Sequence, residues 1–173
     1  MAEYVNGDLL ESDCYYIVHQ TNCLTVDDHG LSKTMNTKYP HGNVYAKRTR
    51  IGKRNLATIE TRSRPGHIDI LEGVPNIVCM YGQWRPGSLY SKWFKIYPEY
   101  SQPETKENRL LWFRKCLKRF GLYILEKDQK VKVGFPYRIG CGLAGGCWDD
   151  YKKAIERWAV KYSTHVRCVI YKV

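Results

Sequence analysis

The sequence predicts one α/β domain of three layers, in which helices cover both faces of a central mixed β-sheet. The chain has 173 residues, enough for a single well-filled core. Short apolar runs rich in β-branched and aromatic residues alternate along it with segments of helical periodicity. Two of these runs meet at residues 73–75, which predicts a strand pair within the sheet. We therefore expect residues 1–173 to form one domain.

The first half of the chain contains four predicted strands and one predicted helix. Residues 4–6, 15–20, 67–71 and 76–81 are the strand candidates, each bounded by turn residues or charge. Residues 32–39 form a helical pattern that Ser32 opens as a cap and Pro40 ends, because the residue before a proline avoids helical geometry.

The second half contains two predicted helices and two predicted strands. Residues 106–125 and 149–160 have helical apolar periodicity, and two aspartates favour the start of the second helix. Residues 131–135 and 166–171 are the strand candidates. The apolar residues of the helices are Leu110, Leu111, Phe113, Leu117, Phe120, Leu122 and Leu125 in the first, opposite Arg114, Lys115, Lys118 and Arg119, and Ala154, Ile155, Trp158 and Ala159 in the second.

Residues 83–103 fit neither pattern, and a loop of this length is uncommon unless it is functional. The segment is interrupted by proline, and its aromatic rings alternate with cations. The rings suit stacking on nucleic-acid bases or on an adenine, and they suit a hydrophobic cluster under a long loop equally well. The rings are Trp84, Tyr90, Trp93, Phe94, Tyr97 and Tyr100.

The charge favours anionic partners. With 28 Lys plus Arg against 17 Asp plus Glu, the formal net charge is +11. Nucleotides, nucleic acid, phosphorylated metabolites and acidic surfaces all suit such a chain. The strongly basic residues 47–64 either contact a nucleic-acid backbone or form a solvated connection that tunes solubility.

No run approaches the ~20 consecutive apolar residues that span a bilayer, and the N-terminus has no secretory pattern. The seven cysteines lack the paired spacing of a zinc site, so we expect reduced thiols. These observations predict an intracellular monomer of the cytoplasm or nucleus, with no membrane contact, metal or cofactor.

Two strand–loop–helix segments carry the chemistry. The first runs from Val18 to Ser32, and the second from Phe135 to Gly146, with four glycines within seven residues. In open α/β sheets ligands bind at the carboxyl ends of strands, where helix N-termini and glycine-rich loops present backbone N–H groups to phosphate. The spacing is not that of a P-loop, which leaves a nucleotide diphosphate as the expected ligand. The alternative is that the glycines only make tight turns.

These segments, with the opening Asn6-Gly7-Asp8-Leu9 and Trp148, resemble those of a macrodomain. The likeness is to the branch that contains the terminal ADP-ribose glycohydrolases, the DNA ADP-ribosyl glycohydrolase antitoxins and the yeast-type ADP-ribose 1″-phosphate phosphatase. It extends in order over nearly the whole chain, including Asn22, Tyr39-Pro40 and the Ile-Gly-Cys-Gly loop. It implies the three-layer macrodomain fold and ADP-ribose as the ligand.

The resemblance implies individual ligand contacts. Asp8 would accept a hydrogen bond from the adenine amino group beside the Leu9 backbone, and Asn22 would bind the distal ribose. Arg138 either serves the diphosphate or pairs structurally. The two phosphate loops would supply Val26, Gly30 and Leu31 from the first and Gly140, Cys141, Gly142, Leu143, Ala144, Gly145 and Gly146 from the second.

The chain departs from the glycohydrolases of this branch at two positions, where Gln83 and Ala144 replace a lysine and an aspartate. A lysine nucleophile that forms a Schiff base is therefore absent there. Hydrolysis would need another route. The candidates to orient or activate water are Asn22, Asp27, Asp28, His29 and His19.

Each of these candidates has a structural alternative. Asp27 and Asp28 also suit a cap or a solvated turn, and His29 suits a polar loop position. His19 suits a hydrogen-bonded core histidine, and Cys141 suits close packing under its loop.

The sequence thus predicts a protein that binds ADP-ribose and hydrolyses an ADP-ribose derivative, removing ADP-ribose from a modified protein or nucleic acid. Two alternatives stay open for the same site: a non-catalytic reader of ADP-ribosylation, and a phosphatase acting on ADP-ribose 1″-phosphate. A basic nucleic-acid-binding domain with purely structural glycine loops is the third.

Overall fold

Six strands form one mixed sheet in the computed structural model, which describes residues 1–173. Their order in space is β1-β6-β5-β2-β4-β3, and only β3 runs antiparallel to its neighbour. All six predicted strands and the strand pair at residues 73–75 are present. The strands are β1 (Ala2–Asn6), β2 (Tyr16–Asn22), β3 (Ile68–Leu71), β4 (Asn76–Gln83), β5 (Val131–Pro136) and β6 (Val166–Lys172).

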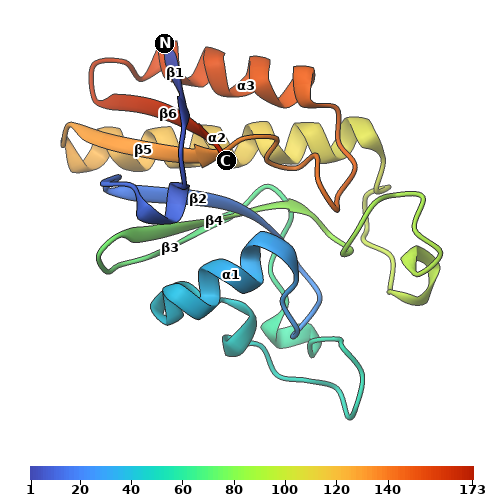
Figure 1. Cartoon of the computed structure of the whole chain (residues 1–173). Coiled ribbons are helices and arrows are strands. Elements are labelled where there is room, and N and C mark those ends of the chain that lie inside the picture. The colour runs from blue at the N-terminus through green and yellow to red at the C-terminus, as the bar shows by residue number, and fades with distance from the viewer.

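Three helices cover the two faces of the sheet (Figure 1). They are α1 (Gly30–Lys38), α2 (Lys106–Lys127) and α3 (Trp148–Lys161). Helices α2 and α3 pack on one face, and α1 packs on the other with the short helical turns of residues 40–47. The three-layer α/β/α architecture that the sequence predicts is confirmed.

The sheet is buried on both faces because its central strands are apolar on both sides. In β2, Tyr16 and Val18 face α2 and α3, while Ile17 faces the α1 side. The same alternation divides Val78 and Ile77 of β4 between the two cores. Successive side chains of a strand point to opposite faces, so these near-continuous apolar runs require a covering layer on each side.

Local capping sets the ends of α2. Thr105 accepts a hydrogen bond from the Asn108 amide at the start, and Asp128 ends the helix in a left-handed conformation. Helix α1 differs from the prediction, because it begins at Gly30 and Ser32 does not cap it. The Ser32 hydroxyl instead lies 3.1 Å from Nδ1 of His19.

The apolar face of α2 is narrower than predicted. Leu111, Leu122 and Leu125 are exposed. The buried stripe has its members about four residues apart, the spacing that keeps side chains on one face of a helix, and these three leucines lie off it. The stripe consists of Trp112, Phe113, Cys116, Leu117, Phe120 and Ile124.

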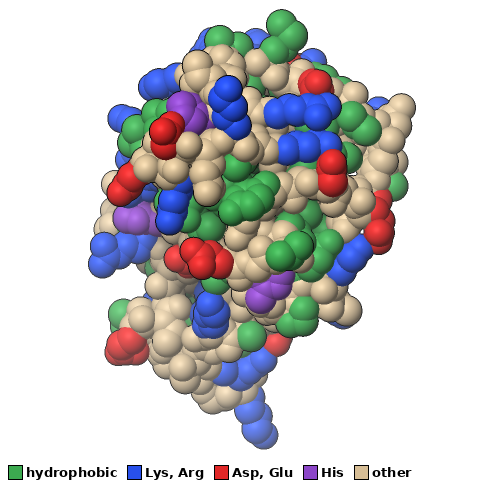
Figure 2. All heavy atoms as spheres, turned by 90° about the vertical axis from the view of Figure 1, so that its left-hand side faces the viewer, with side chains coloured by type: hydrophobic (Ala, Val, Ile, Leu, Met, Phe, Trp, Pro, Cys, Tyr) green, Lys and Arg blue, Asp and Glu red, His purple; other side chains and the backbone are tan.

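The surface carries its charge in a dispersed way on the side opposite the loops that follow β2, β4 and β5. On this side Lys and Arg side chains alternate with Asp and Glu (Figure 2). All seven cysteines are free thiols, and six of them are buried. No helix of the structure is both long enough and apolar enough to cross a membrane.

Candidate functional site

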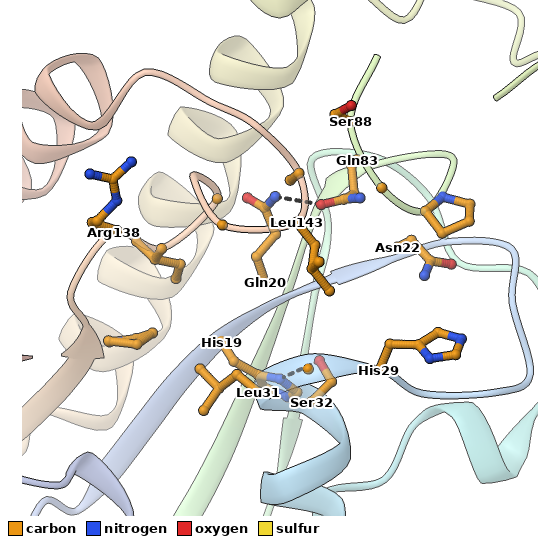
Figure 3. A pocket seen from close by; sticks show the side chains of 18 of the residues that line it. His19, Gln20, Asn22, His29, Leu31, Ser32, Gln83, Ser88, Arg138 and Leu143 are labelled. Carbon is orange, nitrogen blue, oxygen red and sulfur yellow. Dashed lines mark hydrogen bonds between the residues drawn. The ribbon is translucent and has the colours of Figure 1, made fainter. Parts of the chain in front are cut away.

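A cleft of about 760 Å³ opens at the carboxyl ends of β2, β4 and β5. Strand β2 leads to α1 on one face of the sheet, whereas β5 leads to α3 on the other. Ligands of open α/β sheets bind at such a divergence. The walls are the start of α1, residues 86–97 and residues 137–144. Ten predicted site residues line the cleft (Figure 3): His19, Asn22, His29, Gly30, Leu31, Arg138, Gly140, Gly142, Leu143 and Ala144.

The loop after β5 presents free backbone amides. A hydrogen bond of 3.0 Å from the Gly146 amide to the Gly140 carbonyl closes its base. Gly140 has a φ of 76°, and a Cβ placed there would lie 2.7 Å from the Tyr151 ring, so only glycine fits. Within the loop, four amides make no hydrogen bond to the protein: those of Gly140, Gly142, Leu143 and Ala144. Such a concave set of N–H groups suits an anion.

The start of α1 presents a second set of amides. The first three amides of the helix, those of Gly30, Leu31 and Ser32, have no partner, and the side chain of His29 at the cap position makes no capping bond. Unpaired N–H groups and the helix dipole together attract negative charge to a helix N-terminus. Both sets of amides therefore flank one cleft, from opposite walls.

Most of the hydrogen bonds that the Asn22 side chain makes hold the first loop in its conformation. Its Oδ1 accepts from the amides of Leu24 and Thr25, both at 2.9 Å, and its Nδ2 donates to the Thr25 hydroxyl at 3.0 Å. One Nδ2 proton remains for a ligand, since an amide nitrogen has two. Asn22 thus lies where the resemblance expects it, but any substitution there also disturbs the loop.

The basic segment braces this first loop. Arg48, which is buried, donates to the carbonyls of Thr25 at 2.7 Å and Asn22 at 2.6 Å, between the rings of Tyr45 and Tyr81. Asn55 accepts from the amides of residues 26 and 27. Part of the 47–64 segment is therefore structural rather than available to a partner.

Asp27 and Asp28 lie outside the cleft lining, because each has a partner elsewhere. Asp27 pairs with Arg50 at 2.6 Å, and this hydrogen bond lowers the pKa of Asp27. The carboxylate of Asp28 accepts a hydrogen bond from the side-chain Nδ2 of Asn36 at 2.8 Å. Neither carboxylate caps α1, because His29 occupies the cap position. A role for Asp27 or Asp28 in activating water stays a prediction.

The two histidines at the cleft differ in environment. His19 is 1% exposed and lies within 3.2 Å of the Cys79 thiol and 3.1 Å of the Ser32 hydroxyl. Burial lowers its pKa to about 4, so the ring is neutral near pH 7 and suits the core alternative. His29 is exposed at the mouth, across the cleft from Ser88 and below Asn22 in Figure 3.

A pair of glutamines forms the floor. Gln20 Nε2 donates to Gln83 Oε1 at 2.7 Å, and Gln83 Nε2 donates to the Arg85 carbonyl at 2.9 Å. The Oε1 atom of Gln20 is buried without a partner. The position at which relatives are expected to carry a lysine nucleophile therefore holds a neutral, hydrogen-bonded amide.

The remaining predicted residues lie beside the cleft rather than on its surface. Cys141 is buried and directs its thiol to the Ile139 carbonyl at 3.3 Å. Burial raises the pKa of Cys141 to about 11, which matches a packing role. Asp8 caps a short turn by accepting from the Leu10 amide. The predicted residues that do not line the cleft are Asp8, Leu9, Val26, Asp27, Asp28, Cys141, Gly145 and Gly146, and their ligand contacts stay predictions.

A buried carboxylate anchors the aromatic wall. Glu104 accepts from the amides of Trp84 and Arg85 and pairs with Arg109 at 2.9 Å. Arg109 also donates to the carbonyls of Gly87 and Ala144, so it joins the walls after β4 and β5. Trp84 of the 83–103 segment packs on Tyr100, as the hydrophobic-cluster alternative predicts, and Trp93 and Tyr97 line the cleft. Stacking of these rings on an adenine or another base stays a prediction.

Sequence reasoning missed several lining residues. Gln20 carried a usable signal, because it ends a predicted strand beside His19 and Asn22. Ser88 and Ser91 carried none, since their place depends on how the long loop folds back. The other lining residues that were not predicted as site residues are Ser32, Tyr45, Gln83, Pro86, Gly87, Trp93, Tyr97, Pro136, Tyr137 and Ile139.

Comparisons with known proteins identify the fold. The macrodomain of Mycobacterium tuberculosis DarG superposes with a TM-score of 0.69 at 20% identity, over 100% of this chain and 98% of that one. Thermosipho africanus DarTG in complex with ADP-ribose gives 0.62 at 14%, over 98% and 41%. A Trypanosoma brucei macrodomain in complex with ADP-ribose gives 0.59 at 11%, over 98% and 62%.

No family model and no curated protein matches the sequence. The likeness is therefore one of structure, and it spans the whole chain. The superposition includes the six-stranded sheet, its two covering layers and the strand ends where the cleft opens. The chain has the macrodomain fold.

Proposed function

We propose that the chain binds ADP-ribose in the cleft between α1 and the loop after β5. The observation that carries this proposal is the pair of unpaired amide sets on opposite walls, Gly30 to Ser32 and Gly140 to Ala144. A diphosphate places two adjacent anionic groups between such walls, one for each set. The cleft volume is within the range of small-ligand pockets, about 300–1,000 Å³.

The rest of the ligand then has a direction. The distal ribose lies at the β2 end, where Asn22 keeps one free N–H and His29 is exposed. Trp93 and Tyr97 supply apolar surface on the wall after β4. Two solved structures of the same fold contain ADP-ribose, which supports this ligand over other diphosphates.

The residues of the cleft favour binding over hydrolysis. No Asp, Glu, Lys or Cys is among the residues that line it, and the glutamine pair occupies its floor. General acid–base or nucleophilic catalysis most often uses one of these groups or a histidine within reach of the reacting bond, and of the two histidines that line the cleft only His29 is exposed. We therefore infer a reader of ADP-ribosylation as the function that the geometry supports best.

One observation keeps hydrolysis as the second candidate: His29 lines the cleft beside Asn22. An imidazole there has the chemistry to activate water at the distal ribose or at a 1″-phosphate. Incubation with ADP-ribosylated protein, ADP-ribosylated DNA and ADP-ribose 1″-phosphate separates the two functions. Turnover of any of them by the wild-type protein that His29→Ala abolishes would replace the reader assignment with an enzyme.

The binding site itself is tested by following backbone amides in a ¹⁵N NMR titration with ADP-ribose. We expect the largest shifts at the free amides of both walls, and small shifts at amides of α3 beyond its first turn. Shifts confined to the 47–64 segment would contradict the proposed site. Titration with ADP alone tells whether the distal ribose contributes, because only the complete ligand reaches His29.

A further inference from the structure

A second groove, of about 540 Å³, lies at the β3 edge of the sheet. Its lining residues come from the 60–71 segment, from residues 44–48 and from Tyr81 of β4, and none of them lines the ADP-ribose cleft. Three cations with exposed or half-buried side chains face it: Lys47, Arg62 and Arg64. The groove is therefore a separate, positively charged feature of the molecule.

Helix α2 brings further cations to the same place. A Cβ added at Gly66 would lie 3.3 Å from Cδ of Lys115, and the Cys116 thiol donates to the His67 carbonyl at 3.2 Å. Lys115 therefore lies beside Gly66, and Arg119 follows it one turn later on α2, at the i,i+4 spacing that keeps two side chains on one face of a helix. Burial and the charges of Arg119, Arg64 and Lys115 lower the pKa of His67. The basic segment and the basic face of α2, far apart in sequence, thus converge.

None of these five cations is neutralised within the protein. Lys47, Arg62, Arg64, Lys115 and Arg119 form no ion pair. The two carboxylates that line the groove, Glu60 and Asp69, offset only part of this charge, because five cations stand against two carboxylates. Gathering unpaired like charges costs self-repulsion, which an anionic partner removes.

The other cations of the 47–64 segment behave differently. Arg48 holds the first ligand loop, and Arg50 pairs with Asp27. Arg48 also lines the groove, but its guanidinium is buried and used by the loop, whereas Lys53 and Arg54 lie outside the groove lining. The free charge that the segment contributes to the groove therefore comes from Lys47, Arg62 and Arg64.

We propose that this basic groove, with the adjoining face of α2, binds the phosphodiester backbone of a nucleic acid. Cations from three separate segments gather at one edge of the sheet, which suits contacts to several phosphates of one strand. A protein partner would need aromatic or aliphatic anchors, and no lining residue of the groove is an exposed large apolar side chain. The proposal does not depend on ADP-ribose binding.

Fluorescence anisotropy with a labelled single-stranded DNA of about 20 nucleotides, and with RNA of the same sequence, tests this. We expect salt-dependent binding, because each phosphate contact on a single strand contributes about −0.7 to the slope of log K against log salt. The variant R64Q/K115Q/R119Q should weaken binding at least about tenfold near 100 mM salt and reduce the slope by about 2. Preference for DNA or RNA identifies the natural strand.

The control is K130Q/K153Q/R157Q, which removes three exposed cations elsewhere and gives the same net charge. We expect it to bind like the wild type, and both variants to titrate ADP-ribose normally. Equal losses in the two variants, a wild type that shows no salt-dependent binding, or a polyglutamate peptide that competes as well as DNA would overturn the proposal. Circular dichroism confirms folding, and the single variant R64Q replaces the triple variant if that one unfolds.

Discussion

A single buried cation holds the first ligand loop, the guanidinium of Arg48. It gives the carbonyls of Asn22 and Thr25 their hydrogen bonds and lies between two tyrosine rings. Removing it leaves two buried carbonyls without their donor, and charged hydrogen bonds contribute about 1.5–3 kcal/mol each. The net charge includes this residue among the cations that favour an anionic partner, because a count of charges does not distinguish a buried arginine from an exposed one.

We therefore expect Arg48→Ala to lower the free energy of unfolding by about 3 kcal/mol and to weaken ADP-ribose binding. Urea unfolding and calorimetry measure the two effects. Arg54→Ala, an exposed neighbour on the same segment, is the matched control and should change stability by less than about 0.5 kcal/mol. Equal stabilities for the two variants would show that Arg48 does not brace the loop.

His19 makes stability depend on pH. Its pKa in the folded protein is about 4 because it is buried, against 6.5 for the exposed ring. Between these values the unfolded chain binds a proton that the folded one does not, so stability falls as pH decreases from 6.5 towards 4. This contribution is fully present above the unfolded pKa.

Between pH 7 and pH 5 we expect His19 to cost the wild type about 2 kcal/mol of unfolding free energy. His19→Gln keeps a hydrogen-bonding side chain but cannot take up a proton. Its free energy of unfolding should therefore fall by about 2 kcal/mol less than that of the wild type over the same pH range. The difference between two urea titrations measures it. Identical pH dependence in both proteins would mean that the ring is charged in the fold.

At the scale of elements, the glycine loop depends on Gly140. Its left-handed φ and the Tyr151 ring beside it exclude any side chain. We expect Gly140→Ala to cost at least about 2 kcal/mol and to abolish ADP-ribose binding, because the amides lose their arrangement. Gly142→Ala is the control for stability, since a Cβ there meets no atom within 4 Å. Thermal unfolding compares the two variants, and equal melting temperatures would contradict the requirement for glycine at position 140.

Glu104 is the corresponding anchor of the aromatic wall. Its carboxylate is buried and holds two amides and the Arg109 guanidinium. Glu104→Ala leaves that guanidinium buried without a counter-charge, which should cost about 3–5 kcal/mol, whereas Glu107→Ala, at an exposed position in the first turn of α2, should cost little. Hydrogen exchange should show faster exchange in residues 84–100 of the Glu104 variant alone. Unchanged hydrogen exchange in residues 84–100 would show that Glu104 does not anchor the aromatic wall.

The elements were predictable because their signals are local. Short apolar runs placed β2 and β4, and the two aspartates at the start of α3 and Pro40 after α1 are visible in sequence. The site was predictable only where it follows a strand directly, as at Asn22 and Gly140. Glu104 and Arg48 depend on contacts between distant segments, so nothing in their sequence neighbourhood indicated their roles.

For the whole molecule, the cations behind the net charge of +11 fall into groups with different roles. Arg48 and Arg109 are buried and structural, Arg138 alone brings a Lys or Arg charge to the ADP-ribose cleft, and five free cations gather at the β3 edge. In the proposed complex the diphosphate would therefore be met mainly by neutral amides, which hydrogen-bond an anion without a full opposing charge.

The central claim is that this cleft binds ADP-ribose through those amides. Isothermal titration calorimetry of the wild-type protein with ADP-ribose, alongside Gly140→Ala, tests it most directly. We predict one site per chain for the wild type, an affinity that changes little with salt because amides rather than cations meet the diphosphate, and no binding by the variant. Absence of heat with the folded wild type at millimolar ADP-ribose, or equal binding by the two proteins, would contradict the claim.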